Sequence, residues 1–153
     1  MLAPVFFVLL FGIIEVGVIF YGTSVLEKAT QDAARLVRTG QAQASTLTQE
    51  QFRTRICDEI APVLACDANL QIDVRSYASF GGASFAPPVD ADGNLDPSLD
   101  AYEPGNAGDV VLVRSFYTWD VLTPLLAPLI SNMSGGRRLI AATAAFRNEP
   151  FVN

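Results

Sequence analysis

The chain has 153 residues, enough for one domain with a modest core and an appendage, and its formal net charge is −6. That charge argues against nucleic acid as a partner, because the phosphate backbone selects basic surfaces. The chain contains no histidine, so the most common general base and the most common metal ligand are both missing.

Residues 1–22 form an almost wholly apolar run in which Glu15 is the only charge. A helix of this length reaches roughly 33 Å, about the hydrocarbon thickness of a bilayer. A buried core helix and a secretory signal are the alternatives, but a signal peptide has a basic start and a shorter apolar core. No Lys or Arg precedes Lys28. We therefore expect a transmembrane helix at 1–22, surrounded by the lipid bilayer.

Glu15 is unusual because an unpaired carboxylate in lipid costs several kcal/mol. An acid at this position is a functional candidate that is protonated, hydrogen-bonded to hydroxyl groups of neighbours, or paired with a cation of a partner. The alternative interpretation is that Glu15 lies near the outer interface and reaches water.

Segment 23–40 continues the helix without a breaker, and Gly40 is its expected end. Apolar residues recur there at spacings of three and four, which predicts an amphipathic helix with one apolar stripe. The stripe packs on the chain's own domain, on neighbouring subunits, or on both at different heights. We expect contacts with partner helices at Gly12, Glu15, Gly17, Tyr21, Leu26, Ala29 and Ala33.

Residues 45–66 predict a second helix, with Thr48 and Gln51 as a capping box. In an unbroken helix Cys57 and Cys66 would lie roughly 13 Å apart, beyond the reach of a disulfide. A membrane anchor and an oxidising compartment nevertheless favour a disulfide, so the helix must end and the chain must turn back. Two free buried thiols are the alternative.

Three later segments predict strands. "NLQIDVRSY" alternates apolar and polar residues, as half-buried strands do, whereas "DVVLVRSFY" is apolar on both faces and is expected to be central. "RRLIAATAAFRNE" has small alanines on one face, which allow a helix to approach closely; a helical interpretation of this segment is the second choice. The fold class is therefore α+β, with a long N-terminal transmembrane helix, a second helix and a small antiparallel sheet of about three strands.

Two loops join these strands. The first, residues 78–108, contains "DADGNLD", whose oxygens alternate as in a calcium loop, but its glycine comes fourth rather than sixth and no glutamate follows at the twelfth position. A solvated turn is the more common explanation. The weak calcium candidates are Asp90, Asp92, Asn94 and Asp96. The second loop, "TWDVLTPLLAPLISNMSGG", is apolar and is expected to cap the core or touch membrane or a partner.

Catalytic chemistry has little support in the sequence. No glycine-rich phosphate loop follows a strand, Ser84 and Ser131 have no evident base, and paired carboxylates occur only in the acidic loop. We therefore predict a non-catalytic protein with no cofactor, no resident metal and no small-molecule substrate.

The order of these parts resembles TadE-like proteins, which are minor pilins or pseudopilins of the bacterial tight-adherence (Flp) pilus. The resemblance begins with "LAPVFFVLLFGIIEVGVIFYGTSVLEKATQDAARLVRTGQA" and continues through "RICDEIAPVLAC", "NLQIDVRSY", "PGNAGDVVLVRSFYTWDVLTPLL" and "GGRRLIAATAAFRNEPF". In that family a basic leader and a "VEF"-like stretch precede the apolar run and are cut by a prepilin peptidase, whereas this sequence starts inside the run.

The resemblance implies a single-span protein of the bacterial inner membrane with its N-terminus at the cytoplasmic side. Residues 41–153 would form a periplasmic α+β domain, and the protein would act in pilus assembly through contacts with other membrane helices. The alternative is an accessory single-span subunit of another bacterial membrane protein complex.

Overall fold

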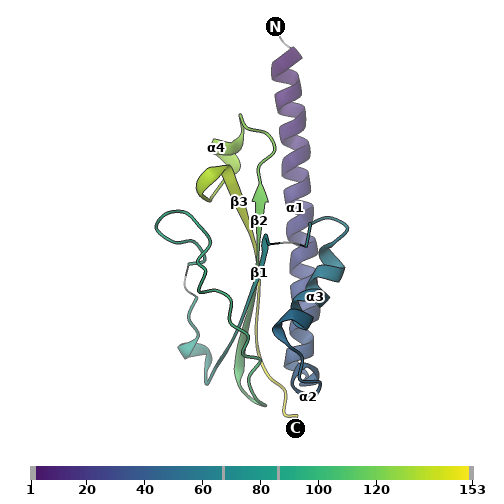
Figure 1. The fold of residues 1–153 in the computed structure, drawn as a ribbon, viewed down its shortest axis with the longest axis vertical. Helices are drawn as coiled ribbons and strands as arrows, with labels where there is room; N and C mark the ends of the chain where they lie inside the picture. Colours follow the sequence, from purple (N-terminus) through teal and green to yellow (C-terminus); the bar gives the residue numbers. More distant parts are fainter. Residues whose placement is uncertain (1–2, 67, 86, 152–153) are drawn as a thin grey trace.

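A computed structural model describes residues 3–66, 68–85 and 87–151. The chain has an α+β fold, in which one long N-terminal helix and two shorter helices precede the first strand, and this confirms the predicted fold class (Figure 1). The elements are α1 (Ala3–Arg38), α2 (Gln41–Ala44), α3 (Gln49–Ile60), β1 (Leu70–Tyr77), η1 (Phe80–Gly82), β2 (Val110–Asp120), α4 (Ala127–Ile130), η2 (Ser134–Gly136) and β3 (Arg137–Arg147).

The three strands form an antiparallel meander in the order β1-β2-β3. Val113 of β2 pairs with Val74 of β1 on one side and with Ala144 of β3 on the other. Nine of the eleven residues of β2 are buried, which agrees with the prediction that a segment apolar on both faces is the central strand. The alanine-rich last segment is a strand, and its helical interpretation is wrong.

Helices α1 and α3 cover one face of this sheet (Figure 1). The small side chains of Ala142 and Ala144 on β3 are buried and let α1 lie close to the sheet. The Thr30 hydroxyl on α1 donates a buried hydrogen bond of 2.9 Å to the Ser115 hydroxyl on β2. The fully buried Ser115 hydroxyl thereby gains a partner on α1, which offsets the cost of its burial. Thr30 Oγ1 also lies 2.7 Å from the Leu26 carbonyl within the helix.

Helix α3 begins at the predicted capping box and ends at Ile60, before the end of the predicted helical segment at residue 66. Gln51 N–H donates to Thr48 Oγ1 at 3.3 Å, and Thr48 N–H donates to Gln51 Oε1 at 3.0 Å, which completes the capping box. The helix stops at Ile60 and the chain turns back, so that a disulfide joins Cys57 to Cys66 with their Cα atoms 5.4 Å apart.

The opposite face of the sheet is covered in part by the long loop between β1 and β2. A second, smaller apolar cluster lies there and consists of Leu99, Phe116, Met133 and Leu139. Beside it, Arg114 Nη2 lies 2.7 Å from Asp73 Oδ2, and both side chains are almost fully buried. The Ala101 N–H also donates to Asp73, so this ion pair links both strands to the loop.

Candidate interaction site on the long helix

The N-terminal turns of α1 project beyond every other labelled element (Figure 1). Among the described residues, α1 is the one helix long and apolar enough to cross a membrane. Only 17% of its 18-residue apolar window is buried in the chain, whereas the core helix of a soluble protein would be mostly buried. The exposed apolar surface of α1 is therefore available to lipid or to other proteins.

The exposed face of α1 carries large apolar side chains over more than four helical turns. Ile13 exposes 73% of its surface and Phe20 exposes 69%. Large apolar patches of this kind mark contacts with membrane or protein. The exposed large apolar side chains of α1 are Val5, Phe6, Phe7, Leu9, Leu10, Phe11, Ile13, Ile14, Phe20 and Tyr21.

Glu15 lies on the other side of α1, only 5% exposed, and faces the chain's own β2–β3 loop. Its Oε1 accepts hydrogen bonds from the Leu122 N–H and, at 3.4 Å, from the Trp119 indole N–H. Its Oε2 accepts from the Thr123 N–H at 2.9 Å. The carboxylate therefore has donors within the chain, and its burial does not depend on a partner's cation.

Two glycines let neighbouring segments approach α1 on this same side. A Cβ at Gly12 would collide with the side chain of Leu126 in the β2–β3 loop, and a Cβ at Gly22 would lie 3.1 Å from Leu64 Cδ2. By contrast, the position of a Cβ at Gly17 has no atom within 4 Å. Gly12 and Gly22 thus serve intramolecular packing, while Gly17 lies on the open face.

The residues expected to contact partner helices divide between the two sides of α1. Leu26, Ala29 and Ala33 are 0%, 0% and 4% exposed and belong to the hydrophobic core of the chain. This arrangement corresponds to packing of the stripe on its own domain, the first of the two interpretations. Gly17 and Tyr21 are exposed, and their contact with a neighbour stays a prediction.

Lys28, which follows Glu27 as the second charge after Glu15, lies where α1 meets α3. Lys28 Nζ lies 2.6 Å from Asp32 Oδ2 and 3.0 Å from Glu59 Oε2. Hydrogen bonds to Asp32 and then to Glu59 raise the pKa of Lys28. These groups are exposed, so water reaches this part of α1, which follows the uncharged part of the helix.

The acidic loop between β1 and β2 uses its oxygens to close its own turns. Asp90 Oδ1 accepts from the N–H groups of Asp92 and Asn94, at 3.0 and 2.8 Å. Asp96 Oδ1 accepts from the Ser98 N–H, and this bond lowers the pKa of Asp96. In the described part of the chain, no cluster of three Asp, Glu, Cys or His side chains is arranged to hold a metal ion.

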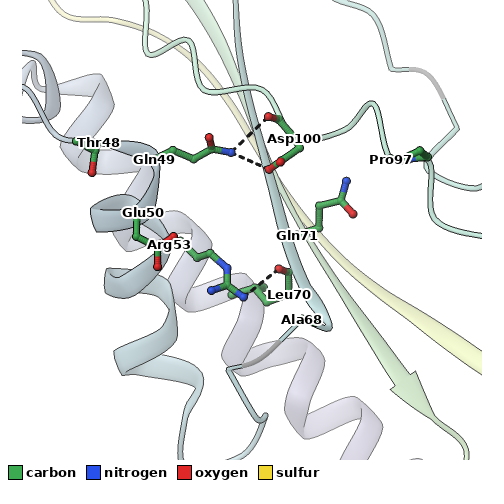
Figure 2. A pocket seen from close by; sticks show the side chains of 9 residues that line it. All are labelled: Thr48, Gln49, Glu50, Arg53, Ala68, Leu70, Gln71, Pro97 and Asp100. Atoms are coloured by element: carbon green, nitrogen blue, oxygen red, sulfur yellow. Dashed lines mark hydrogen bonds between the residues drawn. The ribbon is translucent and has the colours of Figure 1, made fainter.

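A pocket of about 670 Å³ lies between the start of α3 and β1 (Figure 2). Gln49 Nε2 donates to Asp100 Oδ1 at 2.7 Å, and an Arg53 N–H donates to the Leu70 carbonyl at 3.4 Å. The Thr48 hydroxyl is the cap of α3. These polar groups join α3 to the sheet and to the acidic loop, and they form no nucleophile–base pair. The lining residues are Thr48, Gln49, Glu50, Arg53, Ala68, Leu70, Gln71, Pro97 and Asp100.

The bond between Glu15 and the β2–β3 loop was not foreseen from the sequence. The apolar character of that loop was noted, but nothing in a local pattern connects Glu15 to a backbone segment 107 residues away. The available sequence signal was indirect. Where a strand ends in a proline-containing loop, backbone N–H groups lose their partners in the sheet and need other acceptors.

Comparison with known proteins gives one match, at the N-terminus. The sequence model of the family described as TadE-like protein matches residues 1–35, which covers nearly all of α1 and none of the sheet. The match confirms the resemblance over this segment and points to a pilus-associated protein. No curated protein and no solved structure matches the chain.

Proposed function

We propose that this chain is a non-catalytic structural or assembly component of a bacterial tight-adherence pilus. The observation that carries the proposal is α1 itself, a projecting helix with an exposed apolar face, whose sequence matches the TadE-like family over residues 1–35. Such a helix is suited to insertion in a bilayer and to contact with other apolar helices.

We further propose that residues 1–22 cross the inner membrane with the N-terminus at the cytoplasmic side. Residues 23–40 then continue the helix out of the bilayer, and residues 41–153 form a periplasmic domain. Two features support this topology: the exposed charges begin at Glu27 and Lys28, and the disulfide of Cys57 fits an oxidising compartment.

Partner helices are proposed to contact the exposed face of α1 around Gly17 and Tyr21. Small residues at helix interfaces in membranes allow two backbones to approach closely, and the space next to Gly17 is open. Phe20 and Ile13 flank this position with exposed apolar side chains. Neighbouring subunits would cover this face, while the opposite face already packs on the chain's own domain.

Photocrosslinking in the native cell tests this proposal. A photoreactive phenylalanine analogue is placed at Phe20, which is 69% exposed on α1, or at Phe85, a matched control that is 64% exposed in the acidic loop. We expect the Phe20 probe to crosslink to subunits of the tight-adherence pilus machinery and the Phe85 probe to give far less of the same product.

The identity of the crosslinked chain decides between the two functions. Subunits of an unrelated membrane complex would favour the accessory-subunit alternative. Equal crosslinking from Phe20 and Phe85, or none from Phe20 in cells that assemble pili, would contradict the proposed role of α1.

A further inference from the structure

The loop between β2 and β3 lies beside the part of α1 that we assign to the membrane. Leu126 fits against Gly12, and the N–H groups of Leu122 and Thr123 bind Glu15. Both helix positions fall inside the apolar run 1–22. The loop therefore lies alongside the apolar run of α1, on the N-terminal side of the position where its exposed charges begin.

The loop has the composition of a membrane-embedded segment. Residues 121–136 include no charged side chain, and Asp120 and Arg137 flank them. Leu122, Leu125 and Leu129 expose 73%, 73% and 80% of their surfaces. Full exposure of such side chains to water forgoes roughly 1.5–3 kcal/mol each relative to burial, so a surface of three leucines calls for an apolar environment.

Most N–H groups of the loop backbone are satisfied within the chain. Residues 121–131 carry nine N–H groups, because two of the eleven residues are prolines, and eight of the nine donate hydrogen bonds inside the chain. Glu15 accepts two of these bonds, and carbonyl groups of the loop and of Gly136 accept the other six. Irregular backbone is tolerated at membrane depth only when its polar groups are satisfied within the protein.

An apolar groove of about 530 Å³ separates the loop from the exposed face of α1. Phe11, Val18, Leu122 and Leu125 are among its walls. Trp119 is also a lining residue, and amphipathic indole rings are typical of the boundary between lipid and water. Glu15 is the charged residue among the lining residues, and the loop N–H groups hold its carboxylate. The other walls continue the exposed apolar face of α1 onto the loop.

We infer that residues 121–130 are a second membrane-embedded element, whose exposed leucines contact lipid acyl chains beside α1. Glu15 makes this insertion possible, because it supplies acceptors for backbone N–H groups that would otherwise enter hydrocarbon unpaired. The inference rests on the membrane assignment of α1 in the proposed function, and it adds a lipid-binding surface on the periplasmic domain.

Spin-label accessibility tests the inference on the full chain in phosphatidylcholine–phosphatidylglycerol nanodiscs. One label is attached at Leu125→Cys in the loop, one at Phe6→Cys on α1 and one at Phe85→Cys as a water-exposed control. The Leu125 and Phe6 labels are expected to collide with dissolved oxygen freely. Their collision rate with a water-soluble nickel chelate is expected to be at least about tenfold lower than at Phe85, because polar solutes are excluded from hydrocarbon.

The outcomes separate the inference from the proposed function. If the Phe6 label lies in lipid while the Leu125 label meets the nickel chelate as often as Phe85, the loop inference is overturned and the membrane role of α1 survives. If neither label lies in lipid, both fail. A Leu125 label shielded from oxygen and nickel alike is covered by protein, which also overturns contact with lipid in favour of a neighbouring subunit.

A second measurement needs no added cysteine. Trp119 is the single tryptophan of the chain, so its fluorescence reports directly on the base of the loop. Lipids with a quencher near the headgroup or the upper acyl chain should quench Trp119 at least about twofold more than lipids with a quencher at the bilayer centre, because interfacial rings sit at headgroup level. Absence of quenching by any labelled lipid would overturn the inference.

Discussion

Replacing Glu15 by leucine tests whether this carboxylate holds the β2–β3 loop against α1. The substitution keeps α1 apolar and helical but removes the acceptors of the Leu122 and Thr123 N–H groups. A buried donor left without a partner costs about 1–3 kcal/mol. Two such donors would destabilise the docked position of the loop by roughly 2–6 kcal/mol.

The loop can relieve this cost by leaving α1, so the effect should appear as local opening rather than global unfolding. At about 1.4 kcal/mol per factor of ten, even the lower limit corresponds to roughly 30-fold more opening. Hydrogen exchange of the Leu122 and Thr123 amides, measured in nanodiscs, should accelerate by at least that factor. Emission of Trp119 should change as well, since its indole N–H loses the same acceptor.

Two variants serve as controls for this experiment. Glu27→Leu changes an exposed glutamate on the same helix and should leave exchange in the loop unaltered. Glu15→Gln keeps one acceptor oxygen and should give an intermediate acceleration. Unchanged exchange at Leu122 and Thr123 in Glu15→Leu would refute the reasoning, because it would mean that the carboxylate does not determine where the loop lies.

Three further predictions concern the stability of the domain, each measured by denaturant unfolding of the full chain in detergent micelles. Asp73→Ala should lower the free energy of unfolding by about 3–5 kcal/mol, because the buried guanidinium of Arg114 loses the carboxylate of this ion pair. The paired Asp73→Leu and Arg114→Met variant should be clearly more stable than this single variant, and the reverse order would contradict the explanation. Replacing Cys57 and Cys66 by serine should cost about 2.5 kcal/mol, as expected for a loop closed over nine residues, and an unchanged midpoint would argue against the bridge. Burial raises the pKa of Tyr102, whose hydroxyl has no hydrogen-bond partner among the described residues. Since the folded chain then holds this proton more tightly than the unfolded chain, stability should fall as the pH rises above about 10. Tyr102→Phe should remove that part of the fall while changing stability at pH 7 by less than about 1 kcal/mol.

Local sequence signals were sufficient to predict the main helices and strands. Three elements of the structure were predicted from such signals. The capping box at Thr48 predicted α3, the alternation of Leu70, Ile72 and Val74 predicted β1, and apolar residues on both faces predicted β2. These signals work because hydrogen-bonding groups and side-chain periodicity within a few residues determine whether a segment is helix or strand. The small alanines of β3 also predicted the close approach of a helix.

Which face of α1 packs on the chain's own domain could be seen only in the tertiary structure. Periodicity identified the stripe at Leu26, Ala29 and Ala33, but the same stripe suits a partner helix or the chain's own sheet equally well. The folded chain turns it inward, because the strands and α3 together offer a complementary apolar surface. The opposite face, which includes Gly17 and Tyr21, stays exposed.

The long apolar helix, the three strands in chain order and an acid where lipid is expected are all evident from the sequence. The role of that acid is evident only from the folded chain. Glu15 meets Leu122 and Thr123 across 107 and 108 residues of chain, and no local pattern contains such a pairing. Its physical origin is the need of backbone N–H groups at the end of a strand for acceptors, which becomes a specific contact only once α1 and the sheet have packed together.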